Sequence, residues 1–224
     1  MTQHIITRDS ILNGTMSQLV KLSDDEISVM SPQERQMILD QVLGQNSKKN
    51  GIWLFAYGSL IWNPAFDYAE RKVGIVYGYH RSFCLWATIG RGTKDMPGLM
   101  LGLKQGGSCK GIFYRISANK TRTELDIVFR RELITSAYRP TWVRAHIKNR
   151  FSSKALTFVM NQNHDKYAGR LDKETIIDAI ATAQGPLGSC SDYLYETVTQ
   201  LDEHGIPDQN MAALAQEVRR RKSF

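Results

Sequence analysis

Apolar residues follow two patterns along this chain: short unbroken runs that predict strands, and stripes at helical spacing that predict helices. The first strand-like run covers residues 52–57, is rich in branched and aromatic side chains, and ends at Gly58 and Ser59. Glycine lets the backbone bend and approach another group closely, so the N–H groups of this turn can hold an anion or an oxyanion. The alternative is that Gly58 and Ser59 only end the strand.

A long, bent strand is predicted over residues 73–86, with glycines at bulges or barrel corners. The two-residue period of a strand places seven side chains on one face: Val73, Ile75, Tyr77, Tyr79, Arg81, Phe83 and Leu85. An arginine among apolar side chains needs a partner, because burying an unpaired guanidinium is costly. We therefore expect Arg81 to meet a carboxylate of the protein or of a ligand.

Two hairpins are predicted after this strand. In the first, residues 99–103 and 112–116 flank a glycine-rich turn at residues 105–108. In the second, residues 142–147 and 155–160 flank a polar loop. With the two runs before them, these segments give five or six strands. Helices are inserted among them and appended after them, so we expect the α+β class with the strands curled into a small barrel or half-barrel.

The helix predicted between the two hairpins carries the second informative residue. Its start is indicated by Thr121 and Glu124, which have the spacing of a capping box. The apolar stripe of this helix is formed by Leu125, Val128 and Phe129, and Glu132 falls near the middle of the same stripe. A carboxylate there is costly to desolvate unless it is paired. Glu132 is therefore either catalytic or part of a buried salt bridge, for instance with Arg81.

Three other charged residues of this helix, Glu124, Asp126 and Arg131, fall outside the apolar stripe and are expected to be solvated.

Helices are predicted at both ends of the chain. Residues 1–50 form a helical extension in which Ser23 and Ser31 each start a capping box, and we expect this extension to carry no chemistry. Residues 51–224 form the main domain, which ends in helices at about residues 172–183, 192–204 and 209–221, the first capped by Asp172.

Charge and cysteine content narrow the function. A net charge of +7 and a pI near 9.3 favour an anionic partner, either a small acidic metabolite or a nucleic acid bound through the basic residues 219–222. No apolar run is long enough for a membrane helix. The three cysteines are widely spaced and form no ligand cluster with the histidines, which predicts reduced thiols in a cytoplasmic protein without a metal site.

Five stretches of the chain carry a resemblance to a known family: Phe55-Ala56-Tyr57-Gly58-Ser59-Leu60-Ile61-Trp62-Asn63-Pro64, Gly78-Tyr79-His80-Arg81-Ser82-Phe83, Phe129-Arg130-Arg131-Glu132, Gly185-Pro186 and Tyr193-Leu194. Together they resemble the ChaC family of glutathione-specific γ-glutamylcyclotransferases. The resemblance covers about residues 53–205, and the motifs at residues 55–64 and 129–132 are the most specific. One departure is visible at Ala56, where the family usually has glycine.

The resemblance implies a small mixed β-barrel with a cavity, a fold in which the Tyr-Gly-Ser-Leu turn lines the cavity. Carried over residue by residue, it implies that Glu132 is the general acid/base. The residues that would hold the substrate are Ala56, Tyr57, Gly58, Ser59, Leu60 and Ile61. Arg81 is a further candidate, for a substrate carboxylate, and Tyr138 and Tyr193 are candidates for the cavity border, with ordinary packing as their alternative role.

The implied reaction needs no cofactor. The α-amine of glutathione attacks its own γ-carbonyl, and the products are 5-oxoproline and cysteinylglycine. Three alternatives stay open: a cyclotransferase for other γ-glutamyl amines, a non-catalytic relative that only binds glutathione, and a basic module for RNA or DNA. The sequence gives no exposed aromatic pattern or known motif for nucleic acid, and it leaves the oligomeric state open.

Overall fold

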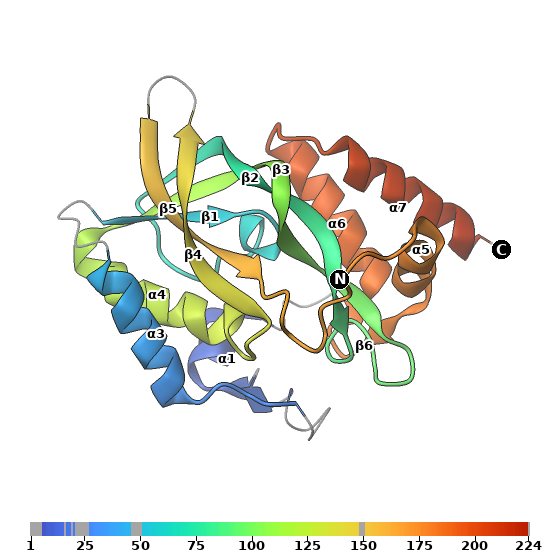
Figure 1. Cartoon of the computed structure of the whole chain (residues 1–224), viewed down its shortest axis with the longest axis horizontal. Coiled ribbons are helices and arrows are strands. Elements are labelled where there is room, and N and C mark those ends of the chain that lie inside the picture. The colour runs from blue at the N-terminus through green and yellow to red at the C-terminus, as the bar shows by residue number, and fades with distance from the viewer. Residues whose placement is uncertain are drawn as a thin grey trace.

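A closed five-stranded β-barrel forms the centre of the molecule (Figure 1). The computed structural model describes residues 6–15, 17–18, 20, 27–45, 51–147 and 151–223. The barrel strands are β1 (Ile52–Ala56), β2 (Glu70–Ala87), β3 (Gly98–Ile116), β4 (Tyr138–Ile147) and β5 (Phe151–Met160). They follow the order β1-β3-β2-β4-β5, and β1 closes the barrel by pairing with β5 in parallel. The other strands adjacent in this order pair antiparallel, and β3 also meets β5 in parallel at one point, which confirms the predicted α+β fold with a mixed barrel.

The first predicted hairpin is wrong, because both of its strands belong to β3. This strand of 19 residues pairs antiparallel with the 18 residues of β2. Gly106 and Gly107 adopt φ values of 100° and 70° and place an irregularity opposite Gly78, so they bend the strand instead of reversing the chain. The second predicted hairpin is confirmed as β4 and β5, which pair along their whole length, although β4 already begins at Tyr138.

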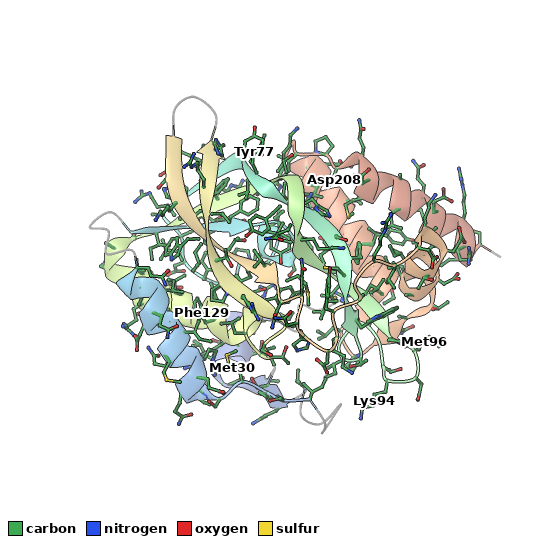
Figure 2. The ribbon with its side chains drawn as sticks, viewed as in Figure 1. Met30, Tyr77, Lys94, Met96, Phe129 and Asp208 are labelled. Carbon is green, nitrogen blue, oxygen red and sulfur yellow. The ribbon has the colours of Figure 1, made fainter. Side chains whose placement is uncertain are left out.

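The irregularity at Gly78 also corrects the prediction that seven side chains of β2 share one face. Gly78 has a φ of 83°, and the register shifts between Tyr77 and Tyr79. Before the shift, Val73 and Tyr77 point to solvent, and Tyr77 is 58% exposed (Figure 2). After it, Arg81 and Phe83 are buried. Gly78 of β2 lies opposite two residues of β3, Gly106 and Gly107, and its positive φ turns the later part of β2 over, so a strict two-residue period fails here.

Helix α4 (Thr121–Glu132) covers one side of the barrel, and its apolar stripe is buried as predicted. Phe129 packs edge-on against Phe158 of β5, with ring centroids 5.6 Å apart (Figure 2). The predicted capping box at its start is wrong. The residue before the helix is Lys120 with no side-chain cap, and the Thr121 hydroxyl instead donates to the Ser117 carbonyl at 2.9 Å.

The N-terminal helices α1 (Arg8–Leu12) and α3 (Pro32–Gly44) pack against α4 (Figure 1). The capping box at Ser31 is confirmed, because Ser31 and Glu34 bond each other's backbone N–H groups. The box predicted at Ser23 lies outside the described residues. Glu124 was expected in water, and that expectation is wrong. It is buried, binds the Arg8 guanidinium through both carboxylate oxygens, and accepts a bond from the Asp67 N–H.

Three helices cover the other side of the barrel: α5 (Lys173–Thr182), α6 (Cys190–Glu203) and α7 (Gln209–Lys222) (Figure 1). The cap at Asp172 is confirmed by its bond to the Thr175 N–H, and a two-residue hairpin, β6 (Gln184–Gly185) with β7 (Gly188–Ser189), links α5 to α6. Within the described residues, none of the helices has the length and apolar content to span a membrane.

The position of β1 decides where the site forms. Both faces of this strand are buried: Trp53, Phe55 and Tyr57 belong to the core shared with α5–α7, while Leu54 and Ala56 belong to the core shared with α3 and α4. The chain leaves β1 between these two cores and enters a short 3₁₀ helix, η1 (Ser59–Ile61). The Gly58-Ser59 turn is therefore held by packing on both sides.

Candidate active site

A cavity of about 150 Å³ lies at the end of β1, where the two cores meet. Its walls come from β1 and η1, from β3, from the last turn of α4, from the starts of β4 and α6, and from the N-terminal segment. The residues that line it are Ile6, Phe55, Tyr57, Gly58, Ser59, Leu60, Met100, Leu101, Arg131, Glu132, Tyr138, Phe158 and Tyr193. The Gly58-Ser59 turn and the Glu132 carboxylate, which the sequence places far apart, thus line one cavity.

Glu132 is the last residue of α4, and its side chain is 16% exposed. Burial raises the pKa of this carboxyl above its ordinary value, and the neighbouring Arg131 guanidinium, with its Nε 3.2 Å from Glu132 Oε1, opposes the rise. The suggested salt bridge between Glu132 and Arg81 does not form, because Arg81 pairs with Asp208; Glu132 forms its ion pair with Arg131 instead. A carboxylate whose pKa lies above its ordinary value is a stronger proton acceptor, and in a cavity it can both take a proton and return it.

Arg131 is buried, against the prediction that it is solvated. Its guanidinium donates to Ser59 Oγ at 2.9 Å and to the Asn63 carbonyl, while it also contacts Glu132. Burial lowers the pKa of Arg131, and the Glu132 carboxylate opposes that effect. Helical periodicity missed this residue because its partners lie on the η1 turn, about 70 positions earlier in the chain. Arg131 therefore links the turn to the carboxylate across the cavity.

Three tyrosines border the cavity, and burial raises the pKa of each hydroxyl. Tyr57 donates to the Phe158 carbonyl at 2.9 Å, and Tyr138 donates to the Leu101 carbonyl at 2.7 Å. Each of these hydroxyls has its proton committed to the backbone and offers only acceptor capacity to the cavity. The hydroxyl of Tyr193 faces Gly58, and a Cβ atom at position 58 would lie only 3.3 Å from it. The turn and Tyr193 fit closely because position 58 is glycine.

Three residues predicted to bind substrate do not line the cavity. Ala56 and Ile61 are buried in the core shared with α3 and α4. Ala56 points away from the cavity because side chains alternate along β1, and its neighbours Phe55 and Tyr57 line the cavity instead. Arg81 meets a protein carboxylate, as one of the two predicted options: its Nη1 lies 2.6 Å from Asp208. Its other donors bond the carbonyls of Tyr57 and Lys110. Each of the three guanidinium nitrogens thus bonds a group of the protein.

One lining residue comes from a segment that was expected to carry no chemistry. Ile6 precedes α1, and its carbonyl accepts a bond from the Asn63 side chain at 2.8 Å. Asn63 follows η1, so this bond fixes the N-terminal segment beside the turn. No feature of the local sequence marks Ile6 for this place, because its position depends on a contact 57 residues along the chain.

Within the described residues there is no group of three or more histidine, cysteine or carboxylate side chains suited to a metal ion. Cys84, Cys109 and Cys190 are buried free thiols. Burial raises the pKa of Cys84 to about 12, which disfavours a thiolate nucleophile. The donor set of the cavity therefore consists of one carboxylate, one guanidinium, hydroxyls and backbone groups, a set suited to proton transfer and to binding a small polar ligand.

This barrel, with its cavity at the end of β1, has the γ-glutamylcyclotransferase fold. A solved γ-glutamylcyclotransferase from yeast, described as specific to glutathione, superposes with a TM-score of 0.70 at 20% identity, covering 76% of this chain and 96% of the yeast chain. The model of the family described as "ChaC-like protein" matches residues 52–221 of the sequence. The chain belongs to the ChaC-like family.

Two curated relatives are similar to this chain over most of their length. A glutathione-specific γ-glutamylcyclotransferase of Escherichia coli is 34% identical over 216 residues, which cover 96% of this chain and 93% of the relative. A protein of Homo sapiens described as glutathione-specific γ-glutamylcyclotransferase 1 is 30% identical, over 75% of this chain and 78% of the human protein. The family match begins at residue 52, so the N-terminal segment lies outside it.

Proposed function

We propose that this protein is a glutathione-specific γ-glutamylcyclotransferase that releases 5-oxoproline and cysteinylglycine, with Glu132 as its general acid/base. The observation that carries the proposal is the Glu132 carboxylate, on a side chain that is 16% exposed, which shares a small cavity with the Gly58-Ser59 turn. Membership of the ChaC-like family supports the same reaction, since the E. coli relative is named for it.

The reaction is an intramolecular amide exchange with a simple proton balance. The α-ammonium of the glutamyl group loses a proton, and its nitrogen then attacks the γ-carbonyl carbon to close a five-membered ring. The bond from that carbon to the cysteine nitrogen breaks. The attacking nitrogen loses two protons in becoming the lactam N–H, and the departing nitrogen gains two in becoming an ammonium. Glu132 takes a proton from the first nitrogen and gives one to the second, so no cofactor is required.

Substrate folding is the other task of the site, because both reacting groups belong to one molecule. Backbone N–H groups of Gly58, Ser59 and Leu60 would bind the α-carboxylate or the developing oxyanion. Arg131 supports this arrangement, since one guanidinium touches both Ser59 Oγ and Glu132. We therefore assign Arg131 as the residue that positions the turn relative to the acid/base.

The basic C-terminus gives little support to the nucleic-acid alternative. Residues 219–222 belong to α7, and their charged groups contact side chains of the same molecule: the three arginines meet acidic or aromatic groups, and the Lys222 ammonium donates to the Ser191 hydroxyl. Arg221 pairs with Glu174 and Asp178, Arg220 with Glu217, and Arg219 lies over the Tyr195 ring. Because these charges are partly compensated, they offer a weak surface for phosphates. We propose that glutathione and not nucleic acid is the partner.

Two further proposals concern organisation and location. We propose residues 1–50 as an extension and residues 51–224 as the domain, a division supported by the start of the family match at residue 52. We place the protein in the cytoplasm because its three buried cysteines are all unpaired, as is usual for proteins in a reducing compartment.

The direct test is to incubate the purified protein with glutathione and to measure both products by mass spectrometry. Equal amounts of 5-oxoproline and cysteinylglycine are expected, with no added metal or nucleotide. γ-Glutamyl dipeptides and γ-glutamyl amines, assayed at the same concentration, test the alternative substrate class. A faster release of 5-oxoproline from those compounds than from glutathione would reject the proposed specificity. Glutathione that binds and persists unchanged would indicate a binding protein instead.

A further inference from the structure

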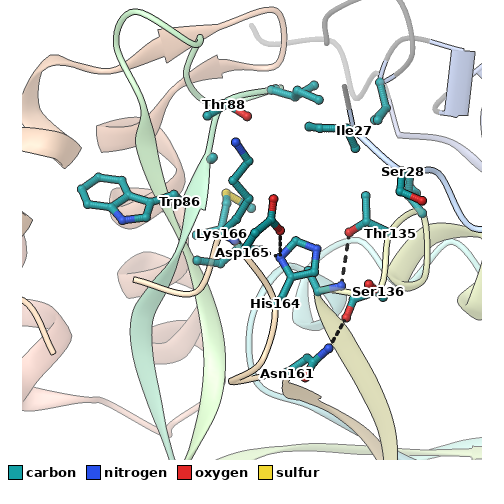
Figure 3. A pocket seen from close by; sticks show the side chains of 18 of the residues that line it. Ile27, Ser28, Trp86, Thr88, Thr135, Ser136, Asn161, His164, Asp165 and Lys166 are labelled. Atoms are coloured by element: carbon teal, nitrogen blue, oxygen red, sulfur yellow. Dashed lines mark hydrogen bonds and ion pairs between the residues drawn. The ribbon is translucent and has the colours of Figure 1, made fainter. Parts of the chain in front are cut away.

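A second, larger cavity adjoins the active-site cavity. It has a volume of about 520 Å³ and lies between the end of β2, the segment that follows α4, and the loop that follows β5 (Figure 3). Met100 lines both cavities. Two consecutive residues also lie at the two cavities: Ala137 lines the larger one and Tyr138 lines the smaller one.

The volumes of the two cavities indicate that a bound tripeptide would occupy both of them. Pockets that enclose a whole drug-sized ligand have volumes of about 300–1,000 Å³, and the cavity at Glu132 has about 150 Å³. It can hold the part of glutathione that reacts, the γ-glutamyl group. The cysteinylglycine part must then extend outside, and the larger cavity is the adjoining space with room for it.

The walls of the larger cavity match a small dipeptide that ends in a carboxylate. Leu85, Met100 and Leu187 provide apolar surface for the cysteine side chain. Lys166 lines the same cavity and is half-buried, and within the described residues no ion pair of its ammonium is found (Figure 3). The adjacent Asp165 carboxylate is largely exposed, and its Oδ1 lies 3.0 Å from His164 Nδ1, an atom that accepts a hydrogen bond from the Lys166 backbone N–H. The ammonium of Lys166 is thus available to an anionic ligand.

The N-terminal segment completes this cavity. Val20, Ile27 and Ser28 all line it, and Figure 3 shows Ile27 and Ser28 across the opening from Lys166. These residues precede residue 52, where the family match begins. Together with Ile6 in the smaller cavity, they show that the extension contributes to the walls of both.

We propose that the larger cavity binds the cysteinylglycine part of glutathione, and that Lys166 pairs with its terminal carboxylate. This proposal rests on the proposed function, because it assumes that the γ-glutamyl end of the same molecule reacts at Glu132. It makes Lys166 a specificity-determining residue. A γ-glutamyl amine without a carboxylate that reaches Lys166 would not form this ion pair, so the protein would prefer glutathione.

The test compares glutathione with its ethyl ester at the glycine carboxylate, which is uncharged at that end. A hydrogen-bonded charge pair changes affinity by about tenfold, so we expect the wild-type KM to be about tenfold higher for the ester at similar kcat. In Lys166→Met, the KM for glutathione rises to the value for the ester and the preference disappears. Lys154→Met, at an exposed position on β5 outside both cavities, is the matched control and keeps the preference.

A Lys166→Met enzyme that still prefers glutathione over the ester tenfold would overturn the proposal. So would equal KM values for both compounds in the wild type. A second measurement separates this outcome from failure of the proposed function. Calorimetric titration of Glu132→Gln, with and without Lys166→Met, reports binding of both compounds without turnover.

The two proposals fail in distinguishable ways. A wild type that releases no 5-oxoproline, combined with a Lys166-dependent preference for glutathione in the titration, would reject the cyclotransferase and retain the second cavity. Normal release of 5-oxoproline without any effect of Lys166 on KM or affinity would reject the second cavity alone.

Discussion

Arg81 is predicted to stabilise the fold, and its replacement by methionine separates this role from substrate binding. Its side chain is only 2% exposed, and it connects three segments: the end of β1 through the Tyr57 carbonyl, β3 through the Lys110 carbonyl, and the start of α7 through Asp208. Asp208 also caps α7, beside the barrel in Figure 2. Losing the guanidinium therefore loosens α7 and the strand that delivers the Gly58-Ser59 turn.

The magnitude follows from what Arg81→Met leaves behind. Removing one member of a buried ion pair costs about 3–5 kcal/mol in the free energy of unfolding. The cost is lower here, because the Asp208 side chain is 24% exposed and water can solvate it once the guanidinium is gone. The buried carbonyl of Tyr57 loses its donor, and an unsatisfied group of this kind costs about 1–3 kcal/mol. The methionine side chain still fills part of the space. We expect a loss of about 3 kcal/mol in the free energy of unfolding, measured by urea denaturation.

Kinetics on the folded fraction of Arg81→Met decide between the two roles. A structural Arg81 leaves the KM for glutathione within about twofold of the wild type, because the guanidinium does not line the cavity. Arg144→Met is the matched control: Arg144 is exposed on β4, and the variant keeps both stability and KM. The reasoning is refuted if KM rises about tenfold while the free energy of unfolding stays unchanged, since Arg81 would then bind substrate directly.

Two further predictions concern the cavity. Ser59→Ala removes the hydroxyl that Arg131 holds but leaves the backbone N–H groups in place, so kcat for 5-oxoproline release should fall less than in Glu132→Gln; a larger fall would reverse the assigned roles. Burial raises the pKa of Glu132 and Arg131 opposes the rise, so kcat/KM falls as the carboxylate protonates on lowering the pH. Arg131→Met removes the opposing charge and moves this fall to higher pH in a pH–rate profile; a fall at unchanged or lower pH would contradict the coupling.

Local sequence patterns predicted those parts of the site that local structure determines. An apolar run that stops at a Gly-Ser pair predicted β1 and its turn, and the 3.6-residue period predicted the buried face of α4 that ends at Glu132. Both features depend on neighbours within one element. The same is true of the caps at Ser31 and Asp172, where the bonded groups lie three residues apart.

The predictions that failed all depended on distant segments. A two-residue period could not reveal that Gly78 and the Gly106-Gly107 pair form an irregularity together, which turns the later half of β2 over. The burial of Glu124 needs Arg8, which is 116 residues away, and the burial of Arg131 needs Ser59. Charged residues become core residues only when the fold brings their partners, so helical periodicity alone assigns them to solvent.

The release of 5-oxoproline from glutathione by Glu132→Gln tests the central claim most directly. Glutamine keeps the shape of the side chain but cannot accept a proton, so the account predicts a folded variant whose kcat falls by at least about a hundredfold. Glu196→Gln, an exposed position on α6, should match the wild type. A Glu132→Gln protein that releases 5-oxoproline at the wild-type rate would contradict the account.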